Sequence, residues 1–495
     1  MKELQIRLDK RKVLVEDVDM SAVPIFEVPG GSDPVMAAVD RLVGGLATRL
    51  AAQEGFTGKA ETSLALTCAG PGLPARVLLA GAGKEADFDG SRQLALAARV
   101  ARSAQACHLA SVGLLARGPG TDAVYLAGLG LSLGAYSFDR YRTADENRPT
   151  LARAVVSTTD DAKGDTAGAL ARARTCANAV CQARDLVNEP GGAMTPARLA
   201  DVARTQALAA GLEVEVLDRK ALQDLGAGLI LGVGAAGRDG PSIVRLAYRP
   251  CGAAIDDAIA LVGQGITFDS GGLNLKPRGS IDDMKQDMAG AAAVLAAMTA
   301  LPALGCTRAV RGYLAIADNL VGADAIRPGD VLTSLSGKTV EIADTDAEGR
   351  LVLADAMTLA IRQGAARLVE LSTLTGACVV ALGEKAAGLF TADDGLADAL
   401  LAAGRRAGED LWRLPMYESQ KGQLKSDVAD LKNVGERWGG AIQGAVFLAE
   451  FAEGRPFAHL DIAGPAFSKK EDHLGPKGAT GFGVRTLIEY LTRPT

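Results

Sequence analysis

Two short stretches of the sequence carry acidic side chains in a pattern that suits metal-dependent chemistry. Residues 267–272 (TFDSGG) hold one acid, and a later run places acids on alternate positions: Asp344, Asp346 and Glu348. Like charges this close raise one another's free energy, so a divalent cation is the simplest compensation, and oxygen ligands favour Mg, Ca, Mn or, less often, Zn. Apolar residues on both sides of the alternating acids favour a buried edge over a solvated turn.

A further acid after the first stretch begins a helix of small residues. Four carboxylates are then available to one site: Asp269, Asp287, Asp346 and Glu348. This number is sufficient to bridge two divalent ions about 3.5–4 Å apart, whose shared water would lose a proton near neutral pH and attack a carbonyl. Two basic residues that closely follow these acids, Lys276 and Arg350, would then stabilise the oxyanion that forms.

A calcium loop of the EF-hand kind is a rival interpretation of residues 344–355. Acids fall at loop positions 1, 3, 5 and 12, and Gly349 falls at position 6. However, Asp355 stands where such a loop has glutamate, and residues 339–342 are β-like where the entering helix should be. A calcium loop also gives no reason for the other acidic stretch. We therefore favour the two-metal site.

Alternating strand and helix patterns indicate the elements that must position these side chains. We expect an α/β fold with two domains, each a mixed or mostly parallel sheet flanked by helices. The expected division is an N-terminal α/β domain over 1–160, a linking helix over 161–190 and a catalytic metallopeptidase domain over 191–495. Ligands of such sheets bind beyond the carboxyl ends of the strands. Asp269, Asp346 and Thr373 each follow a strand candidate, so we expect them to converge there.

Several individual elements are predicted with definite bounds. Expected strands cover 76–80, 112–116, 213–217, 258–262, 309–316 and 367–371, and expected helices cover 91–109 and 162–187. Thr195 is expected to cap a helix that has Pro196 at its first position. Residues 81–84 (GAGK) lack the third glycine of a dinucleotide fingerprint and the Lys-Ser/Thr of a P-loop, so we interpret them as a turn. Residues 140–149 suit an inter-domain connection.

Composition narrows the class of protein. The 495 residues are too many for one compact core, and the net charge of −6 with both signs mixed predicts no nucleic-acid partner. Residues 1–12 lack the apolar stretch of a signal peptide, and the uncharged window 288–307 is interrupted by Pro302, so a buried helix is favoured over a membrane span. Seven scattered cysteines without a Cys-x-x-Cys pair fit reduced thiols, and we expect a cytoplasmic protein.

The acidic motifs resemble those of the leucyl (cytosol) aminopeptidase family. Residues 344–351 (DTDAEGRL) are close to that family's signature, whose usual first residue is asparagine. The likeness extends over residues 267–276, 372–378, 430–433 and 459–464. It covers essentially all of 184–490, whereas the first 160 residues match only in general pattern. Several motifs at the family's spacing make the resemblance specific.

The resemblance implies a two-metal exopeptidase that removes unblocked N-terminal residues from peptides, leucine among the favoured ones, in intracellular peptide turnover. The four carboxylates above fall on the family's metal-ligand positions, and Lys276 and Arg350 fall on its catalytic ones. The implied cofactors are two divalent ions per subunit, with manganese expected and zinc or magnesium as alternatives. A bicarbonate ion held by Arg350 would relay the proton from the attacking water.

The same resemblance implies how substrate binds and how the chain assembles. The free α-amine would dock on one metal beside Asp287, and Lys276 is also a substrate-binding position. Five residues match positions that line the side-chain pocket: Met284, Thr373, Gly376, Ala463 and Ala466. The expected partners are peptide substrates and further copies of the chain in a homo-hexamer, with no membrane and no nucleic acid.

One position departs from the family. Where the family has a lysine that binds the second metal as a neutral amine, this chain has Gln264. A glutamine carbonyl is a weaker ligand and favours harder ions such as Mn or Mg over Zn. Asp344 in place of asparagine adds a negative charge nearby, for which we have no firm account. The alternative is therefore a non-catalytic member of the family with a structural or binding role, in which Gln264 is the first lost ligand. The intact lysine, arginine and carboxylates argue against this alternative.

Overall fold

The computed structural model describes residues 4–10, 12–29, 31–118, 120–143, 150–158, 164–252 and 258–493. The chain divides into two compact units, Met1–Asn178 with Lys470–Lys477 and Ala179–Lys469 with Gly478–Thr495. Helix α5 (Thr166–Asn188) contains the boundary at 178/179. Residues 470–477 belong to the first unit, whereas the sequence analysis expected one continuous catalytic domain over 191–495. Most of the expected connection at 140–149 lies outside the described residues.

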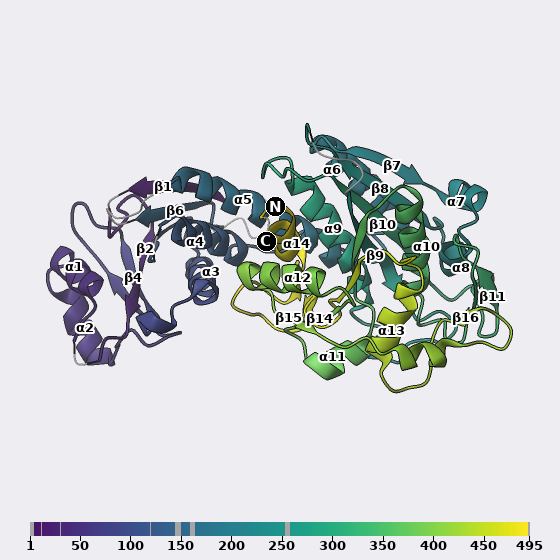
Figure 1. Cartoon of the computed structure of the whole chain (residues 1–495). Helices are drawn as coiled ribbons and strands as arrows, with labels where there is room; N and C mark the ends of the chain where they lie inside the picture. The colour runs from purple at the N-terminus through teal and green to yellow at the C-terminus, as the bar shows by residue number, and fades with distance from the viewer. Residues whose placement is uncertain are drawn as a thin grey trace. The chain divides into compact units, whose positions relative to one another are not determined.

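The first unit is a six-stranded sheet in the order β1-β6-β5-β2-β4-β3, parallel except for the last pair (Figure 1). In chain order the strands are β1 (Gln5–Lys10), β2 (Met20–Phe26), β3 (Ser63–Thr67), β4 (Arg76–Gly83), β5 (Ser111–Leu115) and β6 (Arg153–Thr158). One face packs on α3 (Gly90–Ala106) and α4 (Gly120–Gly134), and the other on α1 (Pro34–Leu42) and α2 (Leu46–Glu54). Alternate residues of β2, β4 and β5 supply the two cores, as the two-residue period requires.

The glycines of residues 81–84 are strand rather than turn, contrary to the sequence interpretation. The amide of Gly81 donates to the carbonyl of Thr62 at 2.8 Å, and that of Gly83 to the carbonyl of Gly58 at 2.9 Å. A Cβ at Gly81 would lie 2.0 Å from the carbonyl oxygen of Lys59. Glycine is therefore required here by the close approach of residues 58–62, not by a tight turn.

The second unit contains an eight-stranded mixed sheet in the order β15-β14-β17-β13-β9-β10-β8-β7. In chain order its strands are β7 (Glu213–Leu217), β8 (Ser242–Tyr248), β9 (Ile259–Asp269), β10 (Val310–Asn319), β13 (Arg367–Ser372), β14 (Ala387–Phe390), β15 (Leu411–Arg413) and β17 (Phe457–Asp461). The central four, β17-β13-β9-β10, are parallel. Strand β14 is antiparallel to β17, and β8 is antiparallel to both β10 and β7. The mixed α/β architecture with flanking helices matches the expected fold class.

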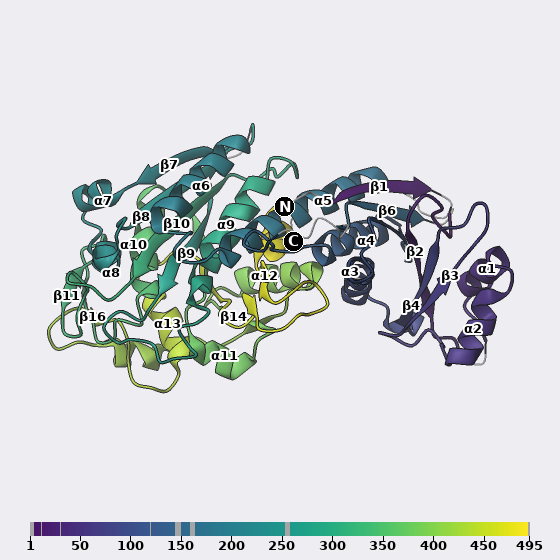
Figure 2. The ribbon, with the colours of Figure 1, turned by 180° about the vertical axis from the view of Figure 1, so that it is seen from behind.

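Helices cover both faces of this sheet (Figures 1 and 2). On one face lie α6 (Pro196–Ala209), α9 (Ala289–Ala300) and α14 (Val484–Thr492), with α12 (Asp394–Ala407) packed on α14. On the other lie α8 (Gly228–Val233), α10 (Gly349–Arg362) and α13 (Gly440–Ala449). The cap predicted for α6 is present, since Thr195 accepts a hydrogen bond from the amide of Arg198.

The apolar window 288–307 is a buried helix and its following turn, as predicted. Small residues let α9 approach the sheet closely: a Cβ at Gly290 would lie 2.1 Å from the carbonyl oxygen of Leu371 on β13. Within the described ranges no helix combines the length and apolarity that a membrane crossing needs.

No disulfide joins the seven cysteines, although Cys107 and Cys251 are exposed rather than packed.

Shorter elements complete the two units. The remaining strands form two small sheets: β11 (Val331–Thr333), β12 (Thr339–Glu341) and β16 (Leu431–Lys432), and β18 (Phe467–Ser468) with β19 (Gly478–Ala479). The remaining helices and 3-10 turns are α7 (Arg219–Leu225), α11 (Gly376–Leu382), η1 (Glu85–Asp87), η2 (Gly234–Ala236), η3 (Met284–Met288) and η4 (Glu418–Leu424).

Candidate active site

Three of the expected carboxylates meet at the carboxyl edge of the parallel strands. Asp269 is the last residue of β9, and Asp346 and Glu348 lie in the loop between β12 and α10. One carboxylate oxygen from each lies within 4.8 Å of the others. Asp269 and Glu348 are buried and Asp346 is half-buried, as the apolar flanks predict. The two distant acidic stretches therefore form one cluster.

Asp287, the fourth carboxylate, lies beside this cluster without joining the group of three. It belongs to η3, just before α9, and is 4% exposed. Its Oδ1 accepts a 2.5 Å hydrogen bond from the hydroxyl of Thr373, whereas its buried Oδ2 has no hydrogen-bond partner among the described residues. Burial, and then the negative charge of Asp269, raises the pKa of Asp287 well above its usual value. An unpartnered buried carboxylate oxygen is costly unless a cation accompanies it.

Lys276 is the cation inside the cluster. Its Nζ lies 2.8 Å from Oδ2 of Asp269 and 2.7 Å from Oδ1 of Asp346. Burial alone lowers the pKa of this amine, but the charges of Asp269 and Glu348 and the two hydrogen bonds outweigh burial and raise the pKa above its ordinary value. Lys276 is therefore protonated at neutral pH and held rigidly at the carboxylates.

The loops that carry these residues are tied together by backbone and hydroxyl contacts. Thr345 donates to the carbonyl of Gly271 at 2.6 Å and accepts from the amide of Asn274 at 2.8 Å. Gly271 has a φ of +85°, and a Cβ there would lie 2.6 Å from the carbonyl oxygen of Asn274. The glycine pair of the TFDSGG stretch thus allows the tight loop that returns Lys276 to Asp269.

Asn319 and Asn433 are two positioning residues that the sequence analysis missed. Asn319, at the end of β10, donates from Nδ2 to Oδ1 of Asp269 at 2.8 Å and to Oε2 of Glu348 at 3.2 Å. Asn433 accepts from the amide of Ala343 at 2.8 Å and donates to the carbonyl of Asp344 at 2.6 Å. Asn319 could have been found, because it is a polar residue three positions after the strand predicted over 309–316, at the same sheet edge.

Arg350 is buried and is the second residue of α10. Its Nη1 donates to the carbonyl of Asn433 at 2.7 Å, and its Nε has no hydrogen-bond partner among the described residues. Burial lowers the pKa of Arg350 to about 10, opposed by the charges of Glu348, Asp344 and Asp461. The guanidinium therefore stays charged at neutral pH and retains a donor for a further acceptor.

The expected pocket residues follow strands that neighbour the cluster. Thr373 follows β13 and contacts Asp287, while Ala463 follows the adjacent strand β17 and donates its amide to Asp461 at 3.2 Å. Gly376 begins α11 and is exposed, and Met284 begins η3 and is half-buried. Ala466 is 2% exposed. Within the described ranges, Thr373 is the one of these five residues that donates a hydrogen bond to a candidate metal ligand.

The calcium-loop alternative is contradicted by the position of Asp355. This residue is fully buried, and its Oδ2 accepts from the amides of Leu229 and Ile230 at 3.0 Å each. Its Oδ1 accepts from the amide of Leu335 at 2.7 Å. Both carboxylate oxygens are therefore used by backbone amides of other segments, and residues 349–362 are helix α10 rather than the end of a loop.

Gln264 lies within reach of the cluster on β9 and is 1% exposed. Its Nε2 donates to the carbonyl of Asp287 at 3.2 Å, and its buried Oε1 has no hydrogen-bond partner in the described part of the chain. A Cβ at Gly349 would lie 2.5 Å from that Oε1. The side chain is thus wedged between Asp287 and the residue after Glu348, with its amide oxygen available as a ligand.

The donor set suits hard divalent cations. It consists of oxygens only, from four carboxylates with Lys276 as the cation in their midst, and the buried Oδ2 of Asp287 has no hydrogen-bond partner among the described residues. Burial, and then the charge of Asp269, raises the pKa of Asp346 to about 6. Excess negative charge at low solvent exposure is relieved by ions that prefer oxygen ligands, such as Mn²⁺ or Mg²⁺.

Comparison with known proteins shows which family this chain matches. The chain matches the catalytic domain of the cytosol aminopeptidase family over residues 181–488 and the N-terminal domain of the same family over residues 22–145. A "Probable cytosol aminopeptidase" of Solibacter usitatus (strain Ellin6076) is 42% identical over 487 residues, 98% of each chain. Another, from Geobacter sp. (strain M21), is 43% identical over 466 residues, 93% of this chain and 94% of the relative.

Two solved structures are also similar. A mutant of tomato leucine aminopeptidase has a TM-score of 0.90 and 33% identity, covering 99% of this chain and 97% of its own. The bottromycin maturation enzyme BotP in complex with Mn has a TM-score of 0.85 and 38% identity, covering 96% of this chain and 99% of its own. The likeness therefore extends through both units.

Proposed function

Because the chain belongs to the cytosol aminopeptidase family and is an aminopeptidase, we propose that it releases unblocked N-terminal residues, leucine among the favoured ones, with two divalent metal ions. The observation that carries this proposal is the meeting of Asp269, Asp346 and Glu348 within 4.8 Å, beside an Oδ2 of Asp287 that has no hydrogen-bond partner among the described residues. These four carboxylates would hold the ions, and Oε1 of Gln264 would add a further oxygen ligand.

Manganese is the ion we favour, because every donor is an oxygen and because glutamine replaces an amine ligand. The similar BotP structure, which is a complex with Mn, supports this choice. When bound, such ions polarise the scissile carbonyl and lower the pKa of the attacking water.

Lys276 and Arg350 would act on the charges that develop during the reaction. Lys276 is fixed by two carboxylates at 2.8 and 2.7 Å and remains protonated, so it can stabilise negative charge on the carbonyl oxygen without reorganising. Arg350 keeps its charge, and its Nε–H has no acceptor among the described residues. This guanidinium would hold a bicarbonate ion, which would supply general acid–base chemistry beside the attacking water.

Asp287 would select substrates with a free terminus. Its Oδ1 is fixed by Thr373, and its Oδ2, which has no partner among the described residues, would lie beside a neutral substrate amine bound to the metal and accept one of its N–H groups. A blocked amine has fewer donors and would leave this buried oxygen unsatisfied, which costs binding energy. Small or apolar residues at Met284, Thr373, Gly376, Ala463 and Ala466 suit an aliphatic side chain such as leucine.

By the family resemblance we further propose a cytoplasmic homo-hexamer that acts in peptide turnover, without membrane or nucleic-acid partners.

The test is release of p-nitroaniline from leucine p-nitroanilide with added Mn²⁺. We expect turnover that requires the metal, is abolished by Glu348→Ala, and is absent with the N-acetylated substrate. Glu384→Ala is a matched control, because this glutamate is 54% exposed and pairs with Lys469 on the surface. Absence of turnover with Mn, Mg, Zn and Co would refute the proposal, and bound metal without turnover would favour the non-catalytic alternative.

A further inference from the structure

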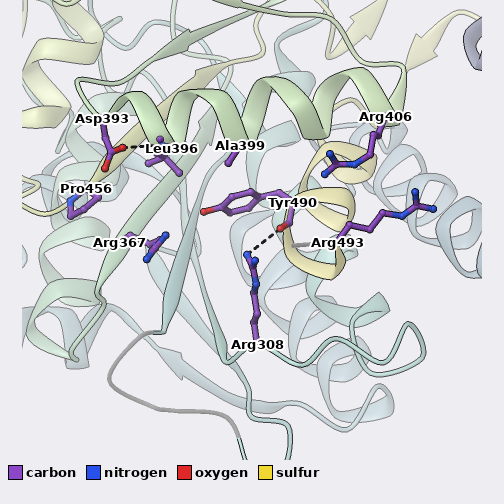
Figure 3. Close-up of a pocket in the computed structure, with 10 residues that line it drawn as sticks. Arg308, Arg367, Asp393, Leu396, Ala399, Arg406, Pro456, Tyr490 and Arg493 are labelled. Atoms are coloured by element: carbon purple, nitrogen blue, oxygen red, sulfur yellow. Dashed lines mark hydrogen bonds between the residues drawn. The ribbon is translucent and has the colours of Figure 1, made fainter. Parts of the chain in front are cut away.

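A cavity of about 240 Å³ in the second unit is lined by four arginines and has no role in the proposed reaction. Figure 3 shows the arginine side chains around the ring of Tyr490, beneath helix α12. The arginines come from separate segments: Arg308, Arg367, Arg406 and Arg493. Such a concentration of like charge around one hollow is unfavourable unless an anion offsets it. We call this site the arginine pocket.

The arginine pocket lies at the edge of the sheet opposite the carboxylate cluster. Arg308 precedes β10, Arg367 is the first residue of β13, and Pro456 directly precedes β17, so all three mark amino ends of parallel strands. Asp269, by contrast, is at the carboxyl end of β9. At about 3.3 Å per residue, the six residues of β13 separate the two edges by roughly 17 Å. A ligand in the arginine pocket would therefore not touch the carboxylates.

Positive charge exceeds negative charge among the described residues at this cavity. Asp393 is the acidic residue that lines it, and one of its oxygens already accepts the amide of Leu396 as the cap of α12, at 2.9 Å. Glu489, which is 3% exposed, pairs with Arg406 at 3.3 Å and with Arg493 at 3.4 Å. Within the described ranges, Asp393 at the cavity and Glu489 behind two of its arginines are the acidic partners of this group.

Arg308, Arg406 and Arg493 are held in place by contacts with α14, and the last two remain accessible. Nη1 of Arg308 donates to the carbonyl of Tyr490 at 3.2 Å, and its Cζ lies 5.9 Å from the centre of the tyrosine ring (Figure 3). Glu489 fixes Arg406 and Arg493, whose side chains are still 31% and 44% exposed. A planar guanidinium donates two parallel hydrogen bonds to phosphate or carboxylate oxygens, and pre-ordering lowers the entropy lost on binding.

We propose that the arginine pocket binds a small ligand carrying a tetrahedral oxyanion, of which a phosphate group is the model. Its volume is below the range of about 300–1,000 Å³ typical for drug-sized ligands, so the occupant is an inorganic anion or a small organic phosphate. The ring of Tyr490 with Leu396 and Ala399 provides an apolar wall for an organic part. Bound anion would link α12 and α14 to the amino ends of the sheet and stabilise this unit.

The test measures binding of inorganic phosphate, sulfate and phenyl phosphate to the Mn-loaded protein by calorimetry. We expect saturable binding that weakens as salt is raised. Tighter binding of phenyl phosphate than of phosphate identifies organic phosphates as the ligand class, and equal affinity identifies the free anion. Absence of saturable binding of all three anions overturns the proposal.

Variants locate the site. The double variant Arg308→Gln, Arg367→Gln should bind phosphate at least ten-fold more weakly, while hydrolysis of leucine p-nitroanilide continues. Arg405→Gln is the matched control, because this exposed arginine is the neighbour of Arg406 on α12 but does not line the cavity. Unchanged affinity in the double variant, or an equal loss in Arg405→Gln, contradicts the assignment.

A second measurement uses the unaltered protein and does not depend on the folding of a variant. Phenylglyoxal modifies accessible arginines, and peptide mass spectrometry locates the modified residues. Phosphate should protect Arg308 and Arg367 and leave Arg405 reactive. Equal modification with and without phosphate overturns the proposal.

Discussion

Asp355→Asn tests which of two opposing effects dominates at a buried carboxyl group. Asp355 is fully buried, which favours the neutral acid, yet it accepts three backbone amides at 2.7–3.0 Å, which favour the carboxylate. Burial is the larger effect and raises the pKa of Asp355 from 3.8 to about 7. The stability that the neutral acid contributes is therefore complete below pH 3.8 and is lost as the pH rises to 7 and above.

The size of this loss follows from the two pKa values. A difference of about 3 between them corresponds to about 4 kcal/mol of unfolding free energy, more than half of which falls between pH 5 and 8. Asparagine does not ionise, so position 355 no longer lowers the unfolding free energy of the variant as the pH rises. It has one acceptor oxygen instead of two and places an NH₂ group against a backbone amide, which costs about 1–3 kcal/mol at every pH. We expect the variant to be less stable than the parent at pH 4 and to draw level with or exceed it by pH 8.

The assay is urea unfolding followed by circular dichroism at several pH values in saturating Mn²⁺. Only the difference in unfolding free energy between variant and parent is interpreted, because the contributions of other titrating groups cancel in this difference. Asp398→Asn, an exposed aspartate on α12, is the control and should show a difference that does not change with pH. If Asp355→Asn instead becomes relatively less stable as the pH rises, the three amides outweigh burial and the reasoning is wrong.

Three further variants probe the metal site and the core. Gln264→Lys supplies an amine ligand and should lower the Mn²⁺ concentration for half-maximal turnover about tenfold; an unchanged requirement would show that Gln264 is no ligand. Gly290→Ala places a methyl group 2.1 Å from the backbone oxygen of Leu371 and should cost about 1–3 kcal/mol or more, read as a lower Tm, whereas an unchanged Tm would contradict the close approach. His459→Gln removes the buried partner of Glu370 and should cost about 3–5 kcal/mol in urea unfolding, and a loss below 1 kcal/mol would show that the pair is not stabilising.

Local patterns in the sequence were sufficient for many elements of the fold. Buried parallel strands are nearly continuous apolar runs, so β9, β10 and β13 were recognised, and the cap and proline of α6 are local signals that hold in the structure. The antiparallel directions of β8 and β14 were not predictable, because strand direction depends on pairing with distant segments and leaves no local trace. The strand character of Gly81–Gly83 was missed for the same reason.

The sequence by itself determined which residues could do chemistry here. Asp346 and Glu348 alternate beside an apolar run, and Asp269 ends a predicted strand, so their types and spacing pointed to one acidic site. Only the tertiary structure decided how those groups are held: Asn319 bridges two of the carboxylates. The tertiary structure also brings together the four arginines of the arginine pocket, which come from segments that share no motif. The physical reason is that hydrogen bonds and charge clusters depend on sheet register and helix packing between distant segments, whereas spacing along the chain reports only neighbours.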